Sequence, residues 1–173
     1  MSKAALKKAI KDMEKDSLGE IILELYESRP EAKEYLEFWL NPDAEAELQK
    51  YRKKVFKIFF ISEGKPRKSP SLAELKKLTK YFQSLGVESE KNADLLLYTL
   101  ETFCNWLALR RHVVSKKPTF DKMAAEVSAY LESAAIEDLF AIRLERVKEL
   151  AQSIFDQGEE LRRRRWRWRW YYL

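Results

Sequence analysis

The stretch that decides the fold is residues 88–114, ESEKNADLLLYTLETFCNWLALRRHVV. At 100° per residue, its apolar side chains fall on two opposite faces of a helix. One face carries Ala93, Leu96, Leu97, Leu100, Phe103, Cys104 and Leu107, and the other carries Leu95, Tyr98, Trp106 and Leu109. Because both faces need apolar neighbours, the pattern predicts a central helix with other helices packed around it.

The sequence on both sides has the same helical spacing of apolar residues, with start and stop signals between the segments. Ser71 and Glu74 have the spacing of a capping box, and Gly86 can end the same helix in the left-handed conformation. Ser17 and Glu20 have that spacing too and predict the start of another helix. These signals predict an all-α fold, a single compact and irregular array of about eight helices without tandem repeats.

Pro30 and Pro42 suit the first turn of two further helices, because a proline there loses no hydrogen bond. The helix after Pro42 carries the stripe Leu48, Tyr51, Val55, Ile58 and Phe59, and the helix after Pro30 carries Tyr35, Leu36, Phe38, Trp39 and Leu40. We expect both helices to be heavily buried. The last helix is expected to run up to Gly158.

Residues 62–69, SEGKPRKS, combine Gly, Pro, Ser and three basic side chains without helical spacing. This composition predicts the longest exposed loop of the chain. We therefore expect a helical domain over residues 1–161, divided by this loop into two halves. Residues 162–173 form a separate basic and aromatic C-terminal tail.

Length, cysteine content and charge narrow the class of protein. The 173 residues suit one domain, the single cysteine excludes an intrachain disulfide, and the N-terminus is too highly charged for a signal peptide. No apolar run approaches the ~20 residues of a transmembrane helix. Six of the 33 basic residues lie in the tail, so residues 1–161 hold 27 basic against 28 acidic side chains. We expect a soluble cytoplasmic protein without a transmembrane segment, in which only the tail is basic.

Four short segments carry a resemblance to a known family: SKAALKK, LELYES, EAKEYLEFWLNPD and LQKYRKKVFKIFF. Together they resemble an uncharacterised family of small bacterial all-helical proteins, a domain of unknown function, over residues 2–60. The resemblance implies a stand-alone bacterial protein and supplies no catalytic residues. The Arg and Trp ending departs from the expected family pattern.

A polar stripe runs along the central helix through Asp94, Glu101, Asn105 and His112. At 1.5 Å per residue, neighbours seven positions apart are separated by about 10 Å, so the four side chains cannot meet at one metal ion or one substrate bond. Only Glu101 and Asn105 are close to each other. The stripe is best interpreted as the solvated side of a mostly buried helix.

Other catalytic arrangements are disfavoured. His112 is the only histidine, Cys104 lies in an apolar stripe as an inert thiol, and no glycine-rich phosphate loop is present. We therefore predict no catalytic residue, no metal site and no cofactor, and we do not expect an enzyme.

The tail, RRRRWRWRWYYL, alternates positive and aromatic side chains. Its candidate binding residues for an anion or a partner are Arg162, Arg163, Arg164, Arg165, Arg167, Arg169, Trp166, Trp168 and Trp170. Guanidinium groups pair with phosphates, and indole rings stack on bases or settle at a lipid interface. Alternatively, the rings fold back onto the helical body. The spacing fits both a strand and a continuing helix, so periodicity does not decide between them.

Two functional hypotheses follow. The first is a non-catalytic interaction module of the bacterial cytoplasm, with a helical groove for a protein partner. The second is a protein that associates with nucleic acid or an anionic membrane through the tail. The oligomeric state is left open.

Overall fold

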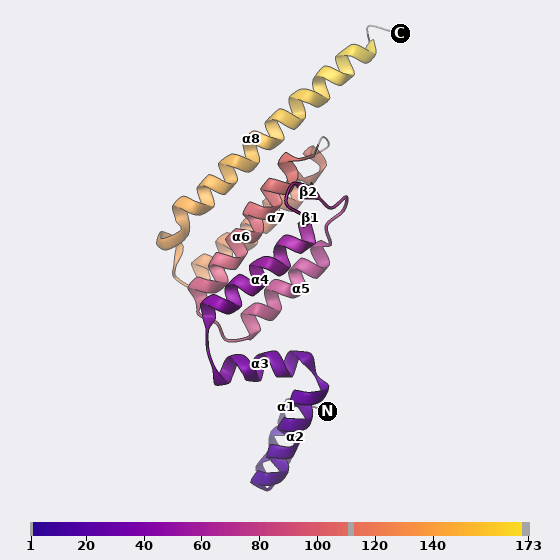
Figure 1. Ribbon diagram of the computed structural model, residues 1–173. Helices are drawn as coiled ribbons and strands as arrows, with labels where there is room; N and C mark the ends of the chain where they lie inside the picture. The colour runs from indigo at the N-terminus through magenta and orange to yellow at the C-terminus, as the bar shows by residue number, and fades with distance from the viewer. Residues whose placement is uncertain (1, 111–112, 171–173) are drawn as a thin grey trace. The chain divides into compact units, whose positions relative to one another are not determined.

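The computed structural model describes residues 2–110 and 113–170, with side chains up to Arg163. The described chain forms eight α-helices, one 3-10 helix and a small two-stranded sheet (Figure 1), so the fold is all-α as predicted. The elements are α1 (Lys3–Lys11), α2 (Lys15–Ser28), α3 (Pro30–Leu40), α4 (Ala44–Phe59), β1 (Phe60–Ser62), β2 (Lys65–Pro66), α5 (Leu72–Ser84), α6 (Ser89–Ala108), η1 (Val114–Lys116), α7 (Lys117–Ser133) and α8 (Glu137–Trp170). Within these described ranges, no helix has both the length and the apolar content needed to cross a membrane.

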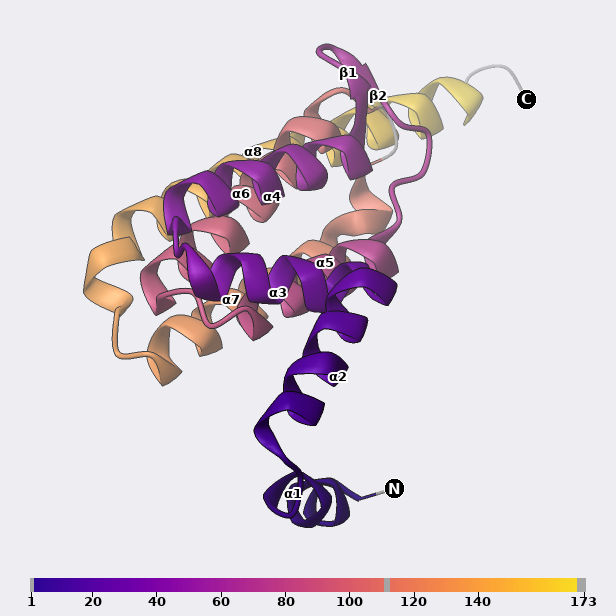
Figure 2. The same cartoon turned by 60° about the horizontal axis from the view of Figure 1, so that its bottom comes forward.

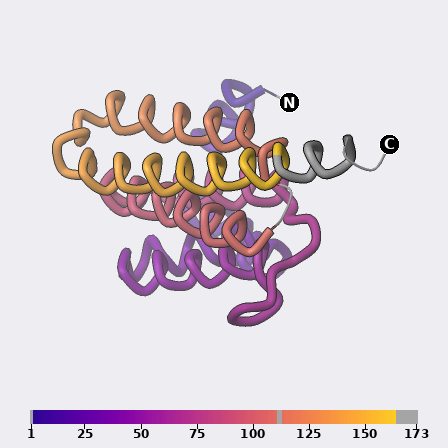
Figure 3. The backbone as a smooth tube through the Cα atoms, turned by 90° about the horizontal axis from the view of Figure 1, so that it is seen from above, coloured from indigo at the N-terminus to yellow at the C-terminus, as the bar shows by residue number. Residues whose placement is uncertain are grey.

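The chain divides into two compact units, Met1–Asp43 and Ala44–Leu173. The second unit is built around α6, which packs against α4, α5, α7 and α8. Figure 2 shows α4 and α6 lying alongside each other, and Figure 3 shows α7 and α8 side by side. The prediction of a central helix is therefore confirmed.

The core of the second unit contains a chain of aromatic rings among its aliphatic side chains. Phe103 of α6 lies 5.6 Å from Phe59 of α4 and 6.3 Å from Phe120 of α7, measured between ring centroids. Phe120 in turn meets Phe155 of α8 edge to face at 6.0 Å. These contacts connect four helices through one chain of rings, in the offset and tilted arrangements that aromatic pairs favour.

The apolar stripe of α6 is buried as the spacing predicts. Leu100 and Cys104 are fully buried, and Trp106 on the opposite face is 4% exposed. Leu96 and Tyr98 are only half-buried. Leu109 is exposed, at 53%. It follows Ala108, the last residue of α6, so the apolar face ends one residue earlier than predicted.

The capping-box signal predicts the start of α5 correctly, but the same signal in α2 does not mark a helix start. The Ser71 hydroxyl accepts a hydrogen bond from the Glu74 N–H at 3.3 Å, and Gly86 has a φ of +79° just after the helix. In contrast, Ser17 lies inside α2, which begins at Lys15 with Glu14 as its N-cap. The Ser17 signal failed because the two residues before it are already helical.

The stripe predicted for α4 is confirmed, since Leu48, Tyr51, Val55, Ile58 and Phe59 are all buried. The same prediction for α3 is wrong. Trp39 is 68% exposed and Leu40 is 65% exposed. Within its unit α3 packs against α2, where the Tyr26 hydroxyl donates to Glu37 at 3.0 Å. One neighbouring helix cannot cover an apolar arc as wide as that of α3.

Residues 62–69 include part of a hairpin rather than a plain loop. β1 and β2 pair antiparallel, and Gly64 between them has a φ of +68°. The Trp106 indole N–H donates to the Arg67 carbonyl at 2.8 Å and ties the segment to α6. The segment joins α4 and α5, which pack against each other within the second unit.

The last helix passes through Gly158 and continues to Trp170, beyond the predicted end. A Cβ atom at Gly158 would lie 2.6 Å from the Val113 side chain and 3.4 Å from that of Val114. Gly158 therefore allows Val113 and Val114 to approach α8 closely, and it does not end the helix.

Candidate functional site

The polar stripe of α6 is the first candidate, and two of its members are joined by an arginine of another helix. Arg143 of α8 donates to both carboxylate oxygens of Glu101, at 2.6 and 2.9 Å, and also contacts Asp94. Arg52 of α4 donates to the other oxygen of Asp94 at 2.7 Å. The single guanidinium group of Arg143 thus joins the two carboxylates, which lie seven residues apart on α6. This ion cluster, defined as Arg52, Asp94, Glu101 and Arg143, fastens α4, α6 and α8 together.

Within the ion cluster, hydrogen bonds stabilise the charged forms of Asp94 and Arg143. Burial by itself would raise the pKa of Asp94, but hydrogen bonds from Arg143 and Arg52 outweigh it and keep the pKa below its usual range. The hydrogen bonds with Glu101 raise the pKa of Arg143 in the same way. Groups that stay ionised around neutral pH are poor proton donors and acceptors. The ion cluster therefore suits a structural role.

Asn105 and His112 do not belong to this cluster. Asn105 is exposed and makes no contact with the two arginines, while His112 lies outside the described residues. The interpretation of a purely solvated stripe holds for Asn105 and needs correction for Asp94 and Glu101, which are both half-buried. Their partners lie 42 and 49 residues away along the chain, where local periodicity gives no signal.

Cys104 is confirmed as a buried residue. Its side chain faces the Val147 carbonyl at 3.8 Å, and burial raises the pKa of its thiol to about 12. A thiol in this state does not act as a nucleophile. Among the residues whose side chains are described, no group of three or more His, Cys, Asp or Glu could hold a metal ion.

The tail continues α8 as a helix up to Trp170. Of the two conformations that its spacing allowed, strand and helix, the helix is the one observed. Arg162 and Arg163 are exposed, and Arg163 pairs with Glu159 one turn earlier at 3.3 Å. The structure describes side chains only up to Arg163. The other predicted binding residues therefore fall outside this range: Arg164, Arg165, Trp166, Arg167, Trp168, Arg169 and Trp170.

A groove with a partly apolar lining lies between α5 and α7, over α6. It encloses about 550 Å³, within the range of ligand and peptide pockets. Its floor includes Leu96, Thr99 and Leu100 of α6, and its walls include Leu75 of α5 and Met123 of α7. No sequence signal identified this groove, because it forms where two helices pack on a third.

The rim of this α5–α7 groove is mostly basic. Lys76 and Lys80 line the α5 side, and Lys122 and Glu126 line the α7 side. The Lys76 ammonium pairs with the Glu126 carboxylate across the groove at 3.3 Å. Lys80 and Lys122 are exposed, so the rim carries an excess of positive charge over an apolar floor.

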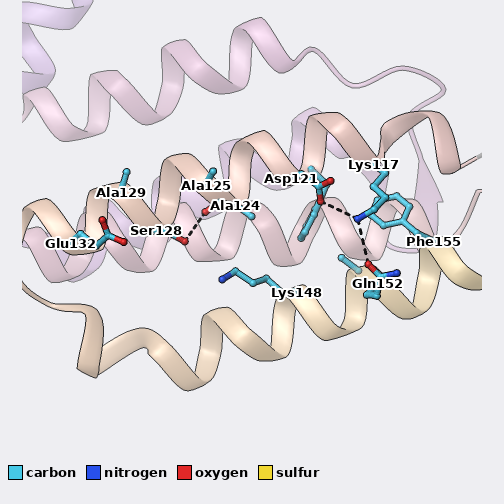
Figure 4. Close-up of a pocket in the computed structure, with 12 residues that line it drawn as sticks. Lys117, Asp121, Ala124, Ala125, Ser128, Ala129, Glu132, Lys148, Gln152 and Phe155 are labelled. Carbon is cyan, nitrogen blue, oxygen red and sulfur yellow. Dashed lines mark hydrogen bonds and ion pairs between the residues drawn. The ribbon is translucent and has the colours of Figure 1, made fainter.

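A second pocket of about 540 Å³ lies between α7 and α8 (Figure 4). Small residues of α7, such as Ala125 and Ala129, leave the space, and Lys148 of α8 reaches into it. At one end Lys117 bonds to Asp121 and to Gln152, both at 3.3 Å. Because Lys117 is held by Asp121 and Gln152, and Lys148 pairs with Glu145 outside the lining, these polar groups do not converge on one point and this pocket is the weaker candidate.

Comparison with known proteins gives one match. The model of a protein family described as a family of unknown function, DUF6155, matches residues 1–163. No curated protein matches, and no solved structure matches. The predicted resemblance to a domain of unknown function is confirmed, over more of the chain than residues 2–60.

Proposed function

We propose that this chain, which belongs to the DUF6155 family of unknown function, is a non-catalytic binding protein whose α5–α7 groove takes up an amphipathic helix of a protein partner. The observation that carries the proposal is the groove itself, an apolar floor between two helical walls. Helices bind proteins in grooves of this kind through apolar side chains spaced three or four residues apart.

The lengths of the two walls support a helical occupant, which would replace the exposed Lys76–Glu126 ion pair across the groove. The α5 wall runs from Leu72 to Gln83, and the α7 wall runs from Thr119 to Ser133. At 1.5 Å per residue these walls are about 16 and 21 Å long. An occupant helix of about 11 to 14 residues would match them.

The charge of the rim indicates the chemistry of the partner. Apolar side chains on one face of the partner helix would cover Leu96 and Met123, which are both half-buried. Acidic side chains beside that face would meet Lys80 and Lys122, which favours the correct partner and speeds the encounter. The expected partner is thus an acidic amphipathic helix.

The chemistry of the other candidates supports binding over catalysis. The ion cluster is committed to joining helices, and Cys104 is buried. A lone buried thiol also suits the reducing cytoplasm of a bacterium, which is where we propose that the protein acts.

Selection of peptides tests the proposal. A library of helical peptides of about 14 residues is panned against the full chain. Selected peptides should share an apolar i, i+3 or i+4, i+7 pattern with acidic flanks. Met123→Glu should weaken their binding about tenfold or more, because it places a charge on the apolar wall.

Ser153→Glu is the matched control, since Ser153 is exposed on α8 and gains the same charge. Both variants keep the arginines of the tail, so a difference in binding between them does not come from the tail. Peptides that bind both variants as strongly as the unaltered protein would contradict the groove as the binding site.

A second candidate function rests on the continuation of α8. The helix extends to Trp170, and residues 160–163, which follow the buried Gly158 by two positions, are exposed. A helix rich in Arg and Trp suits nucleic acid or an anionic membrane as its partner. If four to six phosphates of a single strand are neutralised, the log–log salt slope of binding should be about −3 to −4.

Fluorescence anisotropy with an oligonucleotide, and co-sedimentation with anionic vesicles, test this alternative. The full chain should bind one of them, and a chain ending at residue 161 should bind neither. Equal binding by both chains would contradict a role for the tail.

A further inference from the structure

The first unit, α1 to α3, has no core of its own. None of the described residues 2–43 is buried. Its exposed apolar side chains include Leu6 at 51%, Leu23 at 63% and Trp39 at 68%. α2 and α3 pack together, whereas α1 packs extensively against neither of them. A helical unit of this size needs further apolar contacts to be stable.

The charges of this unit are separated between its helices. α1 carries Lys3, Lys7, Lys8 and Lys11, and it has no acidic residue. α2 carries Asp16, Glu20, Glu24 and Glu27, and its only basic residue is Lys15. All of these side chains are exposed.

Each set of charges forms a stripe next to apolar side chains. Residues at spacings of three and four share a helix face, so Glu20, Leu23 and Glu27 lie together on α2. On α1, Lys7 and Lys11 lie beside Leu6 and Ile10 by the same rule. The basic stripe from Lys3 to Lys11 is about 12 Å long, and the acidic stripe from Asp16 to Glu27 is about 16 Å long. The two stripes are therefore complementary in charge, can lie side by side over the length of the shorter one, and both have apolar neighbours.

We propose that this unit binds a second copy of the chain, with the basic stripe of α1 in each copy lying on the acidic stripe of α2 in the other. Such a contact is reciprocal and closes after two copies, as in most homodimers. Leu6 of one copy and Leu23 of the other are covered in the process. The occupant is a second copy because the chain itself carries both complementary surfaces. The inference is independent of the α5–α7 groove, which belongs to the second unit.

Charge exchange between full-length variants tests the proposal. In one variant Lys3, Lys7 and Lys11 are changed to Glu, and in the other Glu20, Glu24 and Glu27 are changed to Lys. Sedimentation velocity should show a dimer for the unaltered protein. Each variant alone should have a dimer dissociation constant at least about tenfold higher, because like charges then face each other.

Mixing the two variants is the decisive step. In the mixed pair each α1 again faces an α2 of opposite charge, so a dimer with one copy of each variant should form. A single chain with all six substitutions should also dimerise by itself. These two results show in addition that the variants fold.

The proposal is overturned if the unaltered protein is monomeric at all concentrations, if either variant alone dimerises as the unaltered protein does, or if the mixture remains monomeric.

Discussion

Replacing Arg143 with Gln should destabilise the second unit more than any other single change at its surface. The guanidinium makes hydrogen bonds to Glu101 and Asp94 with 32% of its side chain exposed. Exposed ion pairs contribute about 0 to 1 kcal/mol, whereas removing one partner of a buried pair costs about 3 to 5 kcal/mol. For a half-buried arginine with two partners, we expect a loss of about 2 kcal/mol in the free energy of unfolding. Urea unfolding followed by far-UV circular dichroism at pH 7 measures this loss.

The loss should shrink in acid. The pKa of Asp94 is lower in the folded protein than in the unfolded chain. Its contribution to stability is therefore present above the unfolded pKa of about 4 and is lost as the pH falls through the folded pKa. Once Asp94 is protonated, its ion pair with Arg143 no longer stabilises the fold, so Arg143→Gln removes less stability. The difference between the two proteins should be smaller at the lowest pH that keeps both folded than at pH 7.

Arg146→Gln is the matched control, because Arg146 is exposed one turn away on α8 and makes no ion pair among the described residues. It should change the free energy of unfolding by less than about 0.5 kcal/mol. Equal losses in the two variants, or a loss from Arg143→Gln that does not depend on pH, would refute the role of the ion cluster.

Four further experiments test the core, the last helix and the hairpin. Leu100→Ala should cost about 2 to 5 kcal/mol in urea unfolding, since Leu100 is fully buried, and a loss below about 0.5 kcal/mol would contradict its place in the core. A thiol reagent at pH 8 should label Cys104 only in denaturant, because burial raises its pKa to about 12; rapid labelling of the native protein would argue against that burial. Gly158→Ala should lower the melting temperature despite its better helix propensity, as the new Cβ meets Val113 at 2.6 Å, and a rise would mean that the valine moves away freely. Within the body of the chain, residues 1–161, limited trypsin digestion should first cut between Ser62 and Ser69, a segment that is mostly exposed; a resistant segment with first cuts inside helices would contradict this.

The sequence predicted those features that depend on local spacing. Burial of α4 and α6 follows from apolar residues at helical intervals; the prediction holds at every position of the α4 stripe and at most positions of the two α6 faces. The ends of α5 follow from Ser71 and Gly86, whose backbone chemistry is local.

The features that were missed depend on distant parts of the chain. A wide apolar arc predicts burial only if enough neighbours exist, and α3 has too few within its unit. Gly158 was interpreted as a helix end because its close neighbour Val113 is 45 residues away. The strands of the hairpin contain three and two residues, too few for an alternating pattern to be recognised. The α5–α7 groove depends on how three helices pack, which no single segment encodes.

The central claim, that the α5–α7 groove binds a helix of a protein partner, is tested most directly by photo-crosslinking in cells. A photoreactive amino acid is placed at Met123 on the groove wall and, as the control, at Ser153 on α8. We predict that Met123 gives a crosslinked protein absent from the Ser153 sample, and that the crosslinked segment is an amphipathic helix with acidic flanks. No specific product at Met123, or the same products at both positions, would contradict the claim.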